Sequence, residues 1–432
     1  MTMTGLNARL LCVRTLIRSI ETKSYSNLAL NHALLRAEEL EPRDKQLCTR
    51  LYQGTLERLL TLDACIAAHS KRPPEKLDLP VLCVLRCGIC ELLYLHTPES
   101  AAVNLWTEAV KKLKKTSAAG MVNAVLRGFL RGGSQIPLPT EPVKAMSVQY
   151  SVPVPLLEAL LHDYDEPTVT AFLADALEVP PVCLRRNPLQ TGNDALFAQM
   201  GAEAVPEIPL AYRLKRGADA LTDSAAFHVQ DLASQLCCLA LDPQPGETVL
   251  DVCAAPGGKT FTIAELMHDQ GRVFAYDLHE NRVNLIRKGA KALRLSCITA
   301  EAGDARETEK PAADRILCDV PCSGFGVIRR KPDIRYKSPG EAAGLPEIQY
   351  QILEASAKAL KPGGVLVYST CTVLKRENEE VVRRFQTAHP EFTPERPWQN
   401  LPALAEYGQE MTTLFPAMLG SDGFFIAKLR KG

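Results

Sequence analysis

The chain has 432 residues, of which 46% are hydrophobic and 23% are charged, and its formal net charge is zero. This is the composition of a globular protein with room for two or three domains, and no apolar run reaches the roughly 18–20 residues that a membrane span requires. The amphipathic N-terminus carries Arg9, Arg14 and Arg18 and predicts a helix, not a signal peptide. With 14 cysteines and no secretory signal, the sequence predicts a cytoplasmic protein with reduced thiols.

Basic residues are concentrated in the first third of the chain. Residues 1–140 contain 19 Lys and Arg against 12 Asp and Glu, a net charge of +7, so the remainder carries −7. Such an excess favours an anionic partner for the N-terminal part. The cluster Lys111–Lys115, followed by Arg127 and Arg131 on a predicted helix, is either a solvated helix face or a patch that contacts phosphate groups.

Residues 5–132 are expected to be helical throughout, because apolar positions recur at helical spacing and strand signals are missing. The breaks are expected at the prolines in positions 73, 74, 80 and 98, and one long helix is expected over residues 44–69. Three cysteines at positions 83, 87 and 90 fall on one helix without a second Cys/His pair at zinc spacing, so we expect no metal site.

The pattern of this helical region, with Gly54-Thr55 and Val122–Arg127, resembles the NusB-type RNA-binding helical domain. We therefore expect an RNA-binding domain over residues 1–135. Residues 136–240 are expected to be a Gly/Pro-rich linker and a small mixed α/β subdomain. In this part, helices are expected over 154–164, 166–178 and 225–241, and strands over 182–187 and 211–217.

From residue 248 onward, strand and helix patterns alternate. Strands are expected over 248–253, 272–277, 296–304, 313–321, 363–373 and 423–430, and helices over 261–267, 280–293 and 347–360. Alternation of this kind indicates βαβ units and a mostly parallel sheet. We expect an α/β, Rossmann-like catalytic domain over residues 241–432.

The stretch Leu250–Thr260, LDVCAAPGGKT, joins a strand to a helix through a glycine-rich turn, an arrangement that suits a nucleotide-like ligand. A Walker phosphate loop is excluded because the first glycine it needs is replaced by Cys253. A GxGxxG turn is excluded because Gly257 and Gly258 are adjacent. Two interpretations remain: the first loop of a class I methyltransferase that uses S-adenosyl-L-methionine (AdoMet), and an ordinary turn.

Two acids follow the next strands. Asp277 ends the second expected strand, where related nucleotide folds place the acceptor for ribose hydroxyls, and Asp304 follows the third, at the position that faces the adenine edge. Single acids at strand ends are more often helix caps or turn residues. As a pair in register with the glycine-rich loop, they favour a cofactor site.

Two cysteines follow later strands, Cys322 in Asp319–Gly324 (DVPCSG) and Cys371 in Ser369–Thr372 (STCT). Ligands bind at the carboxyl ends of parallel strands, so both thiols are expected beside the cofactor. A thiolate that adds to carbon 6 of a pyrimidine activates carbon 5 toward the methyl group, which is nucleophilic catalysis. The alternative is a pair of buried, inert structural cysteines.

The segments DVCAAPGGKT, AYDLHENRV, GDAR, CDVPCSGFGVIRRKPDIRY, YSTCTVLKRENE and DGFFIAKL together resemble the bacterial RNA cytosine-5 methyltransferase family, nearest to its Sun/Fmu (RsmB-type) 16S ribosomal RNA subgroup. The resemblance covers almost the whole chain. It implies that Cys371 is the nucleophile, that Cys322 assists product release, and that Asp319 lies near the cytosine ring. It also implies that AdoMet is lined by Cys253, Ala254, Ala255, Pro256, Gly257, Gly258, Lys259, Asp277, Asp304 and Asp319.

The bare chemistry leaves the choice of nucleophile open, because in DNA cytosine-5 enzymes the Pro-Cys thiol attacks, which would nominate Cys322. The chain departs from the family pattern at Gly324-Phe325-Gly326, a departure expected to touch no catalytic position. The basic run Arg329–Lys337 follows. It is either a charged surface loop or a surface for phosphate contact and base stacking beside a target base that has left its stack.

The sequence thus predicts a monomeric AdoMet-dependent methyltransferase that acts on carbon 5 of a cytosine in 16S rRNA and needs neither a membrane nor a metal. Two alternatives remain. One is a related enzyme that acts on another RNA such as tRNA. The other is a non-catalytic RNA-binding or antitermination factor built on the NusB-like domain, which would have no need of the paired cysteines.

Overall fold

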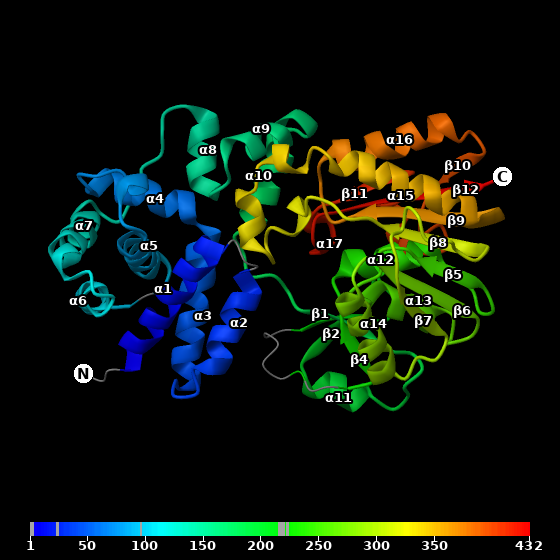
Figure 1. Ribbon diagram of the computed structural model, residues 1–432, viewed down its shortest axis with the longest axis horizontal. Coiled ribbons are helices and arrows are strands. Elements are labelled where there is room, and N and C mark those ends of the chain that lie inside the picture. Colours follow the sequence, from blue (N-terminus) through cyan, green and yellow to red (C-terminus); the bar gives the residue numbers. More distant parts are fainter. Residues whose placement is uncertain (1–3, 23–25, 96, 215–220, 222–223) are drawn as a thin grey trace. The chain divides into compact units, whose positions relative to one another are not determined.

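The computed structural model describes residues 4–22, 26–95, 97–214, 221 and 224–432. By their contacts, the residues divide into two units. Unit 1 comprises Met1–Val169 and Ile328–Ser338, and unit 2 comprises Thr170–Val327 and Pro339–Gly432 (Figure 1). The expected boundaries at residues 135 and 240 stay a prediction. Parts of the expected helical region (23–25 and 96) and of the expected strand 211–217 (215–217) lie outside the described residues.

Unit 1 is helical, as the sequence predicts. Its helices are α1 (Thr4–Thr22), α2 (Ser26–Arg36), α3 (Pro42–Glu57), α4 (Leu59–His69), α5 (Leu79–Tyr94), α6 (Glu99–Lys112), α7 (Ala119–Arg131), α8 (Pro142–Tyr150) and α9 (Val154–Asp163), with short 3₁₀ helices η1 (Pro74–Lys76), η2 (Thr116–Ala118) and η5 (Pro332–Tyr336). Pro80 lies in the first turn of α5 and Pro98 is the N-cap of α6, positions where a missing backbone N–H costs nothing.

Helix α5 runs through the core of unit 1, and the three cysteines at positions 83, 87 and 90 are buried in that apolar core. The one acid of α5, Glu91, is fully buried, and its carboxylate accepts several hydrogen bonds. Its carboxylate accepts hydrogen bonds from Arg9 Nε (2.8 Å), Trp106 Nε1 (2.7 Å) and Thr97 Oγ1 (2.6 Å). A buried charge is tolerated only when it is paired in this way.

The expectation of a single helix over residues 44–69 is wrong. The segment forms two helices, α3 and α4, which are separated at Arg58, where the backbone has φ −131° and ψ 28°. Such a break leaves backbone groups without intrahelical partners. Segment Ile328–Ser338, although distant in sequence, supplies them. Arg335 Nη1 donates to the carbonyl of Glu57 (2.7 Å), and the hydroxyl of Tyr336 accepts from the N–H of Leu59 (2.9 Å).

Unit 2 is built on a mixed eight-stranded sheet with the order β10-β12-β9-β8-β5-β6-β7, in which β11 also pairs with β12. The pairs among β5 to β9 are parallel, whereas β12 runs antiparallel to β9, β10 and β11. The strands are β5 (Thr248–Asp251), β6 (Arg272–Asp277), β7 (Ile298–Ala302), β8 (Ala313–Asp319), β9 (Leu360–Thr370), β10 (Phe392–Glu395), β11 (Met411–Leu414) and β12 (Phe424–Lys431). This confirms the expected parallel core, while β10 and β11 were not expected.

Helices cover both faces of this sheet (Figure 1). The covering helices are α12 (Leu232–Leu241), α13 (Gly258–Leu266), α14 (Glu280–Leu293), α15 (Leu345–Ala359) and α16 (Glu379–Ala388). Alternate strand residues separate the two cores: Val249 and Leu317 pack in the core that includes α12 to α14, whereas Leu250 and Ile316 pack in the core that includes α15 and α16. A strand period of two therefore builds a three-layer α/β domain.

A smaller antiparallel sheet precedes the large one, with the order β2-β3-β1-β4. Its elements are β1 (Cys183–Arg186), β2 (Ala202–Ala204), β3 (Ala211–Leu214), β4 (Phe227–Val229) and the helix α11 (Asp194–Gln199). The helix expected over 225–241 is wrong in its first part, which forms β4 because its backbone pairs with β1. The fully buried pair Arg185–Glu265 (3.3 Å) joins this sheet to α13.

No helix among the described residues is long and apolar enough to cross a membrane. The cytoplasmic location and the monomeric state stay predictions.

The bonds at the α3–α4 break make a testable contribution to stability. Tyr336→Phe should lower the free energy of unfolding by about 1–3 kcal/mol, because the N–H of Leu59 loses its acceptor in a partly buried position. Urea unfolding measures the change. Lys337→Ala, at the exposed neighbouring position, is the control and should stay within about 0.5 kcal/mol of the unsubstituted protein. Equal stability of the two variants would contradict the interpretation.

Candidate active site

The glycine-rich loop lies between β5 and α13, as expected. Gly257 is the N-cap of α13 with φ +111°, and a Cβ there would lie 2.5 Å from the ring of Phe261, so the position requires glycine. Asp251, the last residue of β5 before the loop, is buried and accepts a hydrogen bond from Thr260 Oγ1 (2.7 Å). Burial raises the pKa of Asp251 to about 7, against the opposing effect of the Thr260 bond.

Asp277 ends β6 beside this loop. Its carboxylate accepts a hydrogen bond from the N–H of Ala255 (3.3 Å), which is a loop residue, and forms an ion pair with Arg282 (3.2 Å). Arg282 also donates to the carbonyl of Ala255 (2.8 Å). The acid and the loop, which the sequence assigned to one site, are therefore in direct contact.

Asp304 follows β7, and its neighbour Gly303 donates its N–H to the carbonyl of Asp277 (3.0 Å). The carboxylate of Asp304 forms an ion pair with Arg306 (2.6 Å). Hydrogen bonds from Arg306, opposed by partial desolvation, lower the pKa of Asp304 to about 2. Asp304 is thus held as an anion at the same strand edge as Asp277.

Lys259, in the first turn of α13, reaches the end of β8. Its Nζ donates to Asp319 Oδ2 (2.7 Å) and lies 5.0 Å from the ring centre of Phe424. Burial lowers the pKa of Lys259, but the charge of Asp319, the hydrogen bond to it and the neighbouring cysteines together outweigh burial, so the net shift is upward. Asp319 Oδ1 accepts a second hydrogen bond, from Ser369 Oγ (2.9 Å), so this acid bridges the glycine-rich loop and β9.

The two cysteines nominated by the sequence lie together. Ten of the 14 cysteines are buried, and the four that are partly exposed are Cys253, Cys297, Cys322 and Cys371. The sulfur atoms of Cys322 and Cys371 are 3.2 Å apart. They follow β8 and β9, whose register pairs Asp319 with Ser369 in parallel. The positions of the two strand ends therefore bring the two thiols into contact.

Direct bonds lock the two cysteine turns together. Ser323 Oγ and Thr372 Oγ1 are hydrogen bonded (2.8 Å). The N–H of Ser323 donates to Glu377 Oε2 (2.8 Å), and Gln349 Nε2 donates to the carbonyl of Pro321 (3.0 Å). These bonds fix the turn that carries Cys322.

The departure at Gly324-Phe325-Gly326 was expected to touch no catalytic position, but the structure shows that it contacts the loop that carries Cys371. The N–H of Gly326 donates to the carbonyl of Cys371 (3.0 Å), and its own carbonyl accepts from Gly423 (2.9 Å). A Cβ on Gly326 would lie 2.0 Å from the carbonyl oxygen of Gly423. The glycine therefore permits a backbone approach that supports the cysteine loop.

The basic run Arg329–Lys337 is not a free RNA surface as a whole. Arg335 is fully buried, and both it and Tyr336 are bonded inside unit 1 at the α3–α4 break. Interpreting Arg335 as a phosphate contact and Tyr336 as a stacking residue is therefore wrong, because each already satisfies backbone groups there. Lys331 and Lys337 remain exposed.

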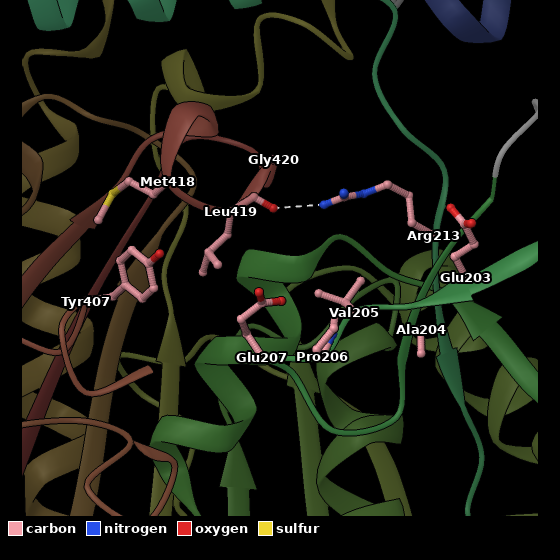
Figure 2. A pocket seen from close by; sticks show the side chains of 10 residues that line it. All are labelled: Glu203, Ala204, Val205, Pro206, Glu207, Arg213, Tyr407, Met418, Leu419 and Gly420. Carbon is pink, nitrogen blue, oxygen red and sulfur yellow. Dashed lines mark hydrogen bonds between the residues drawn. The ribbon is translucent and has the colours of Figure 1, made fainter. Parts of the chain in front are cut away.

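A separate cavity of about 370 Å³ lies in unit 2, and none of the expected site residues line it. Its polar walls include Glu203, Glu207 and Tyr407. Figure 2 shows Arg213 reaching across it to the carbonyl of Leu419 (2.9 Å). This bond joins the small sheet to the chain just before β12. No group of three or more His, Cys, Asp or Glu within the described part of the chain could hold a metal ion.

A Rossmann-like sheet with a glycine-rich first loop, acids after the next two strands and polar side chains at one edge defines a class I methyltransferase domain. A family model described as 16S rRNA methyltransferase RsmB/F matches residues 238–430, and one described as the NusB family matches residues 6–131.

The chain is 36% identical to the probable ribosomal RNA small subunit methyltransferase B of Bacillus subtilis (strain 168), over 98% of this chain and 99% of that protein. It is 35% identical to the protein of the same name from Synechocystis sp. (strain ATCC 27184 / PCC 6803 / Kazusa), over 96% and 98%. The crystal structure of PH0851 shares the fold, with a TM-score of 0.80, 23% identity and coverage of 100% and 99%. The chain belongs to the RsmB/F family of 16S rRNA methyltransferases, with a NusB-family N-terminal domain.

Several residues that hold the site carry no signal that marks a function on its own. Gln349 lies in an ordinary helical pattern, and Ser369 is one of several hydroxyls near Cys371. Glu377 lies in the RENE stretch that contributes to the family resemblance, but an acid after a strand more often indicates a turn or a helix start. Only their burial and their contacts reveal them.

The close approach at Gly326 gives a prediction about stability. Gly326→Ala should lower the free energy of unfolding by roughly 1–3 kcal/mol or more, because the new methyl group would meet backbone atoms of Gly423 and Cys371 that cannot rotate away. Urea unfolding is the measurement. Gly344→Ala is the matched control, since its Cβ would meet no atom within 4 Å. If both variants were equally stable, the close approach would be of no consequence.

Proposed function

We propose that this chain transfers the methyl group of AdoMet to carbon 5 of a cytosine in 16S rRNA, through a covalent bond between Cys371 and carbon 6. The observation that carries the proposal is the 3.2 Å contact between the sulfur atoms of Cys322 and Cys371 at the ends of adjacent parallel strands. It is supported by membership of a family described as 16S rRNA methyltransferases. An inert structural pair would not need to lie at the ligand edge of the sheet.

The residues at the strand ends fit AdoMet. The carboxylate of Asp277 would accept hydrogen bonds from the ribose hydroxyls, and Asp304 would face the adenine. Leu278, which follows Asp277, is 59% exposed and would be available for contact with the flat adenine ring. Residues Cys253–Lys259 would line the remainder of the site. When bound, AdoMet supplies an electrophilic methyl group on a sulfonium centre.

In the proposed reaction the thiolate of Cys371 adds to carbon 6 of the cytosine and forms an S–C6 bond. The electron density this places on carbon 5 would form the new bond to the methyl carbon while the bond from that carbon to the AdoMet sulfur breaks, so that S-adenosyl-L-homocysteine is the leaving group. A base then removes the proton from carbon 5, the S–C6 bond breaks, and the thiolate of Cys371 is regenerated. Asp319, which is fixed by Lys259 and Ser369, would be positioned to bind the cytosine ring.

The chemical environment favours this division of roles between the thiols. A hydrogen bond to Cys371, burial, and the negative charges of Cys371, Glu377 and Asp319 together raise the pKa of Cys322. A thiol that keeps its proton is a poor nucleophile but can donate a hydrogen bond to the neighbouring thiolate. Cys322 is therefore suited to proton transfer and product release, and Cys371 to attack.

The helical unit 1 is proposed to bind the RNA. Residues 1–140 carry a net charge of +7, and Lys112 and Lys114 are exposed at the end of α6. Exposed lysines of this kind suit sequence-independent contact with phosphate groups. Two alternatives are kept: methylation of another RNA such as tRNA, and a non-catalytic antitermination role.

The cofactor assignment predicts that Asp277→Ala weakens AdoMet binding by roughly 1.5–3 kcal/mol, the cost of losing a charged acceptor. Isothermal titration calorimetry with the full chain is the measurement, after circular dichroism has shown that the variant folds. Glu301→Ala, which removes an exposed acid from the neighbouring strand β7, is the control and should bind AdoMet normally. Unchanged affinity in Asp277→Ala would remove Asp277 from the site.

The catalytic assignment predicts different behaviour for the two cysteines on unmodified 16S rRNA. Cys371→Ala should give neither a covalent adduct nor methylated product. Cys322→Ala should still attack and methylate but release product slowly, and should accumulate a protein–RNA species that survives denaturing electrophoresis. The measurements are a denaturing gel and tritium release from carbon-5-labelled cytosine, with tRNA transcripts assayed in parallel.

Cys297→Ala, which alters a partly exposed cysteine away from the pair, is the control and should behave like the unsubstituted chain. An adduct with Cys371→Ala and none with Cys322→Ala would reverse the two roles. Activity on tRNA alone would favour the first alternative. Complete absence of tritium release from either RNA by the unsubstituted chain would favour the non-catalytic alternative.

A further inference from the structure

The feature that the proposed reaction leaves unused is a fully buried acid beside the cysteine pair. Glu377 lies in the 3₁₀ helix η7 (Lys375–Glu377), and its exposed fraction is 0%. One carboxylate oxygen, Oε1, has no hydrogen-bond partner. A buried acid that is only half satisfied costs free energy, so its presence calls for a compensating role.

The other carboxylate oxygen binds the turn that carries Cys322. Glu377 Oε2 accepts from the N–H of Ser323 (2.8 Å) and from Gln349 Nε2 (3.1 Å). Gln349 Nε2 also donates to the carbonyl of Pro321 (3.0 Å). The residues on both sides of Cys322 are therefore held by hydrogen bonds. Ser323 is bonded to Glu377 itself, and Pro321 is bonded to Gln349, the partner of Glu377.

The next residue binds the other cysteine turn. Asn378 Oδ1 accepts from Thr370 Oγ1 (2.6 Å), and Asn378 Nδ2 donates to the carbonyl of Thr372 (3.0 Å). Residues 370 and 372 flank Cys371. The backbone carbonyl of Glu377 in turn accepts from Tyr368 Oη (2.6 Å), which anchors the pair 377–378 to β9. Two adjacent residues thus hold the two cysteine turns, one turn each.

Several ionisable groups surround Cys322. Tyr368 on β9 and Cys371 just after it face Cys322, Glu377 faces it from η7, and Asp319 lies at the end of β8, the strand before it. The charge of Asp319 is largely balanced by Lys259, which is bonded to it at 2.7 Å. The bonds to Glu377 come from a neutral amide and a backbone N–H, so its negative charge is not cancelled.

We propose that Glu377 is a positioning residue that assigns the roles of the two cysteines. It holds the Cys322 turn against Cys371, and its negative charge keeps the proton on Cys322, so that Cys371 is the thiol that becomes the attacking thiolate. This inference rests on the proposed function, because it explains which of two touching thiols attacks. Glu377 acts through the Cys322 turn and not by contact with the RNA or with AdoMet.

The test measures the ionisation of Cys322 in the full chain. In a Cys371→Ala background, the rate of alkylation of Cys322 by iodoacetamide is followed from pH 6 to 10 by mass spectrometry of the peptide that contains it. Adding Glu377→Gln, which keeps the shape of the side chain and removes its charge, should lower the midpoint of the alkylation profile by about one pH unit or more. Thiolate reactivity makes this readout specific to ionisation.

The matched control is Glu380→Gln in the same background, an exposed acid three residues along the chain, which should leave the midpoint unchanged. An unchanged or raised midpoint with Glu377→Gln would overturn the proposal. Because alkylation needs neither RNA nor AdoMet, a chain without methyl-transfer activity would contradict the proposed function and leave the alkylation result interpretable by itself.

A second variant separates position from charge and covers the case in which Glu377→Gln does not fold. Gln349→Leu, with both cysteines present, removes the bonds to Glu377 and Pro321 while the charge remains. We expect kcat for 16S rRNA to fall about tenfold or more with an unchanged KM, since the reacting groups and not RNA binding are disturbed. In the Cys371→Ala background its alkylation midpoint should not fall. An unchanged kcat would overturn the positioning role.

Discussion

The site depends on one constraint: two turns that leave adjacent parallel strands must be held in contact beyond the point where the strand ladder ends. The ladder between β8 and β9 carries the chain as far as Asp319 and Ser369, and one more backbone bond joins Val320 to Ser369 (3.1 Å). Past that point one backbone bond remains, from the N–H of Gly326 to the carbonyl of Cys371 (3.0 Å), and side chains supply the other bonds between the turns. The pair Ser323–Thr372 and the residues 377–378 replace the missing backbone bonds, so the distance between the sulfur atoms follows from buried hydrogen bonds.

Buried polar groups serve a similar purpose elsewhere in the chain. Glu91 gathers Arg9, Trp106 and Thr97 in the core of unit 1, and Glu265 pairs with Arg185 between the small sheet and α13 in unit 2. Each buried acid contacts groups from different elements, so its loss would leave charges or donors unpaired on more than one element. Such networks add less to stability than apolar packing does, but they fix which elements meet and in what register.

The path of the chain after Cys322 adds a second constraint. Residues 328–338 belong by their contacts to unit 1, whereas the residues on both sides of them belong to unit 2. Within unit 1, Arg335 and Tyr336 satisfy the backbone groups freed by the break between α3 and α4. That break lies in a stretch whose apolar pattern is continuous, so it exists because partners for the broken helix come from a distant part of the sequence.

These features show which parts of the fold and of the candidate site were predictable from the sequence. The parallel strands and the covering helices α12 to α15 were largely predictable because their apolar periodicity is local, whereas α16 was not expected. The glycine-rich loop, Asp277 and the two cysteines were also predictable, because strand ends converge at one edge of a parallel sheet. The helix break at Arg58, the strand β4, the close approach at Gly326 and the burial of Arg335 were not predictable. Each is decided by a partner from another part of the chain, which no local pattern records.

The same reasoning explains how two similar thiols can differ. Cys322 and Cys371 are both partly exposed, both follow a parallel strand, and each lies within 3.2 Å of the other. Neither burial nor spacing separates them, and Asp319 is largely neutralised by Lys259. One asymmetry is the carboxylate of Glu377, which is bonded to the residue after Cys322 and not to the turn of Cys371. At short range and in a medium of low dielectric, one uncancelled charge is enough to shift a proton between neighbouring sulfur atoms. Under the proposed assignment, the chemical difference between the cysteines arises from a residue outside the short motifs DVPCSG and STCT that carry them.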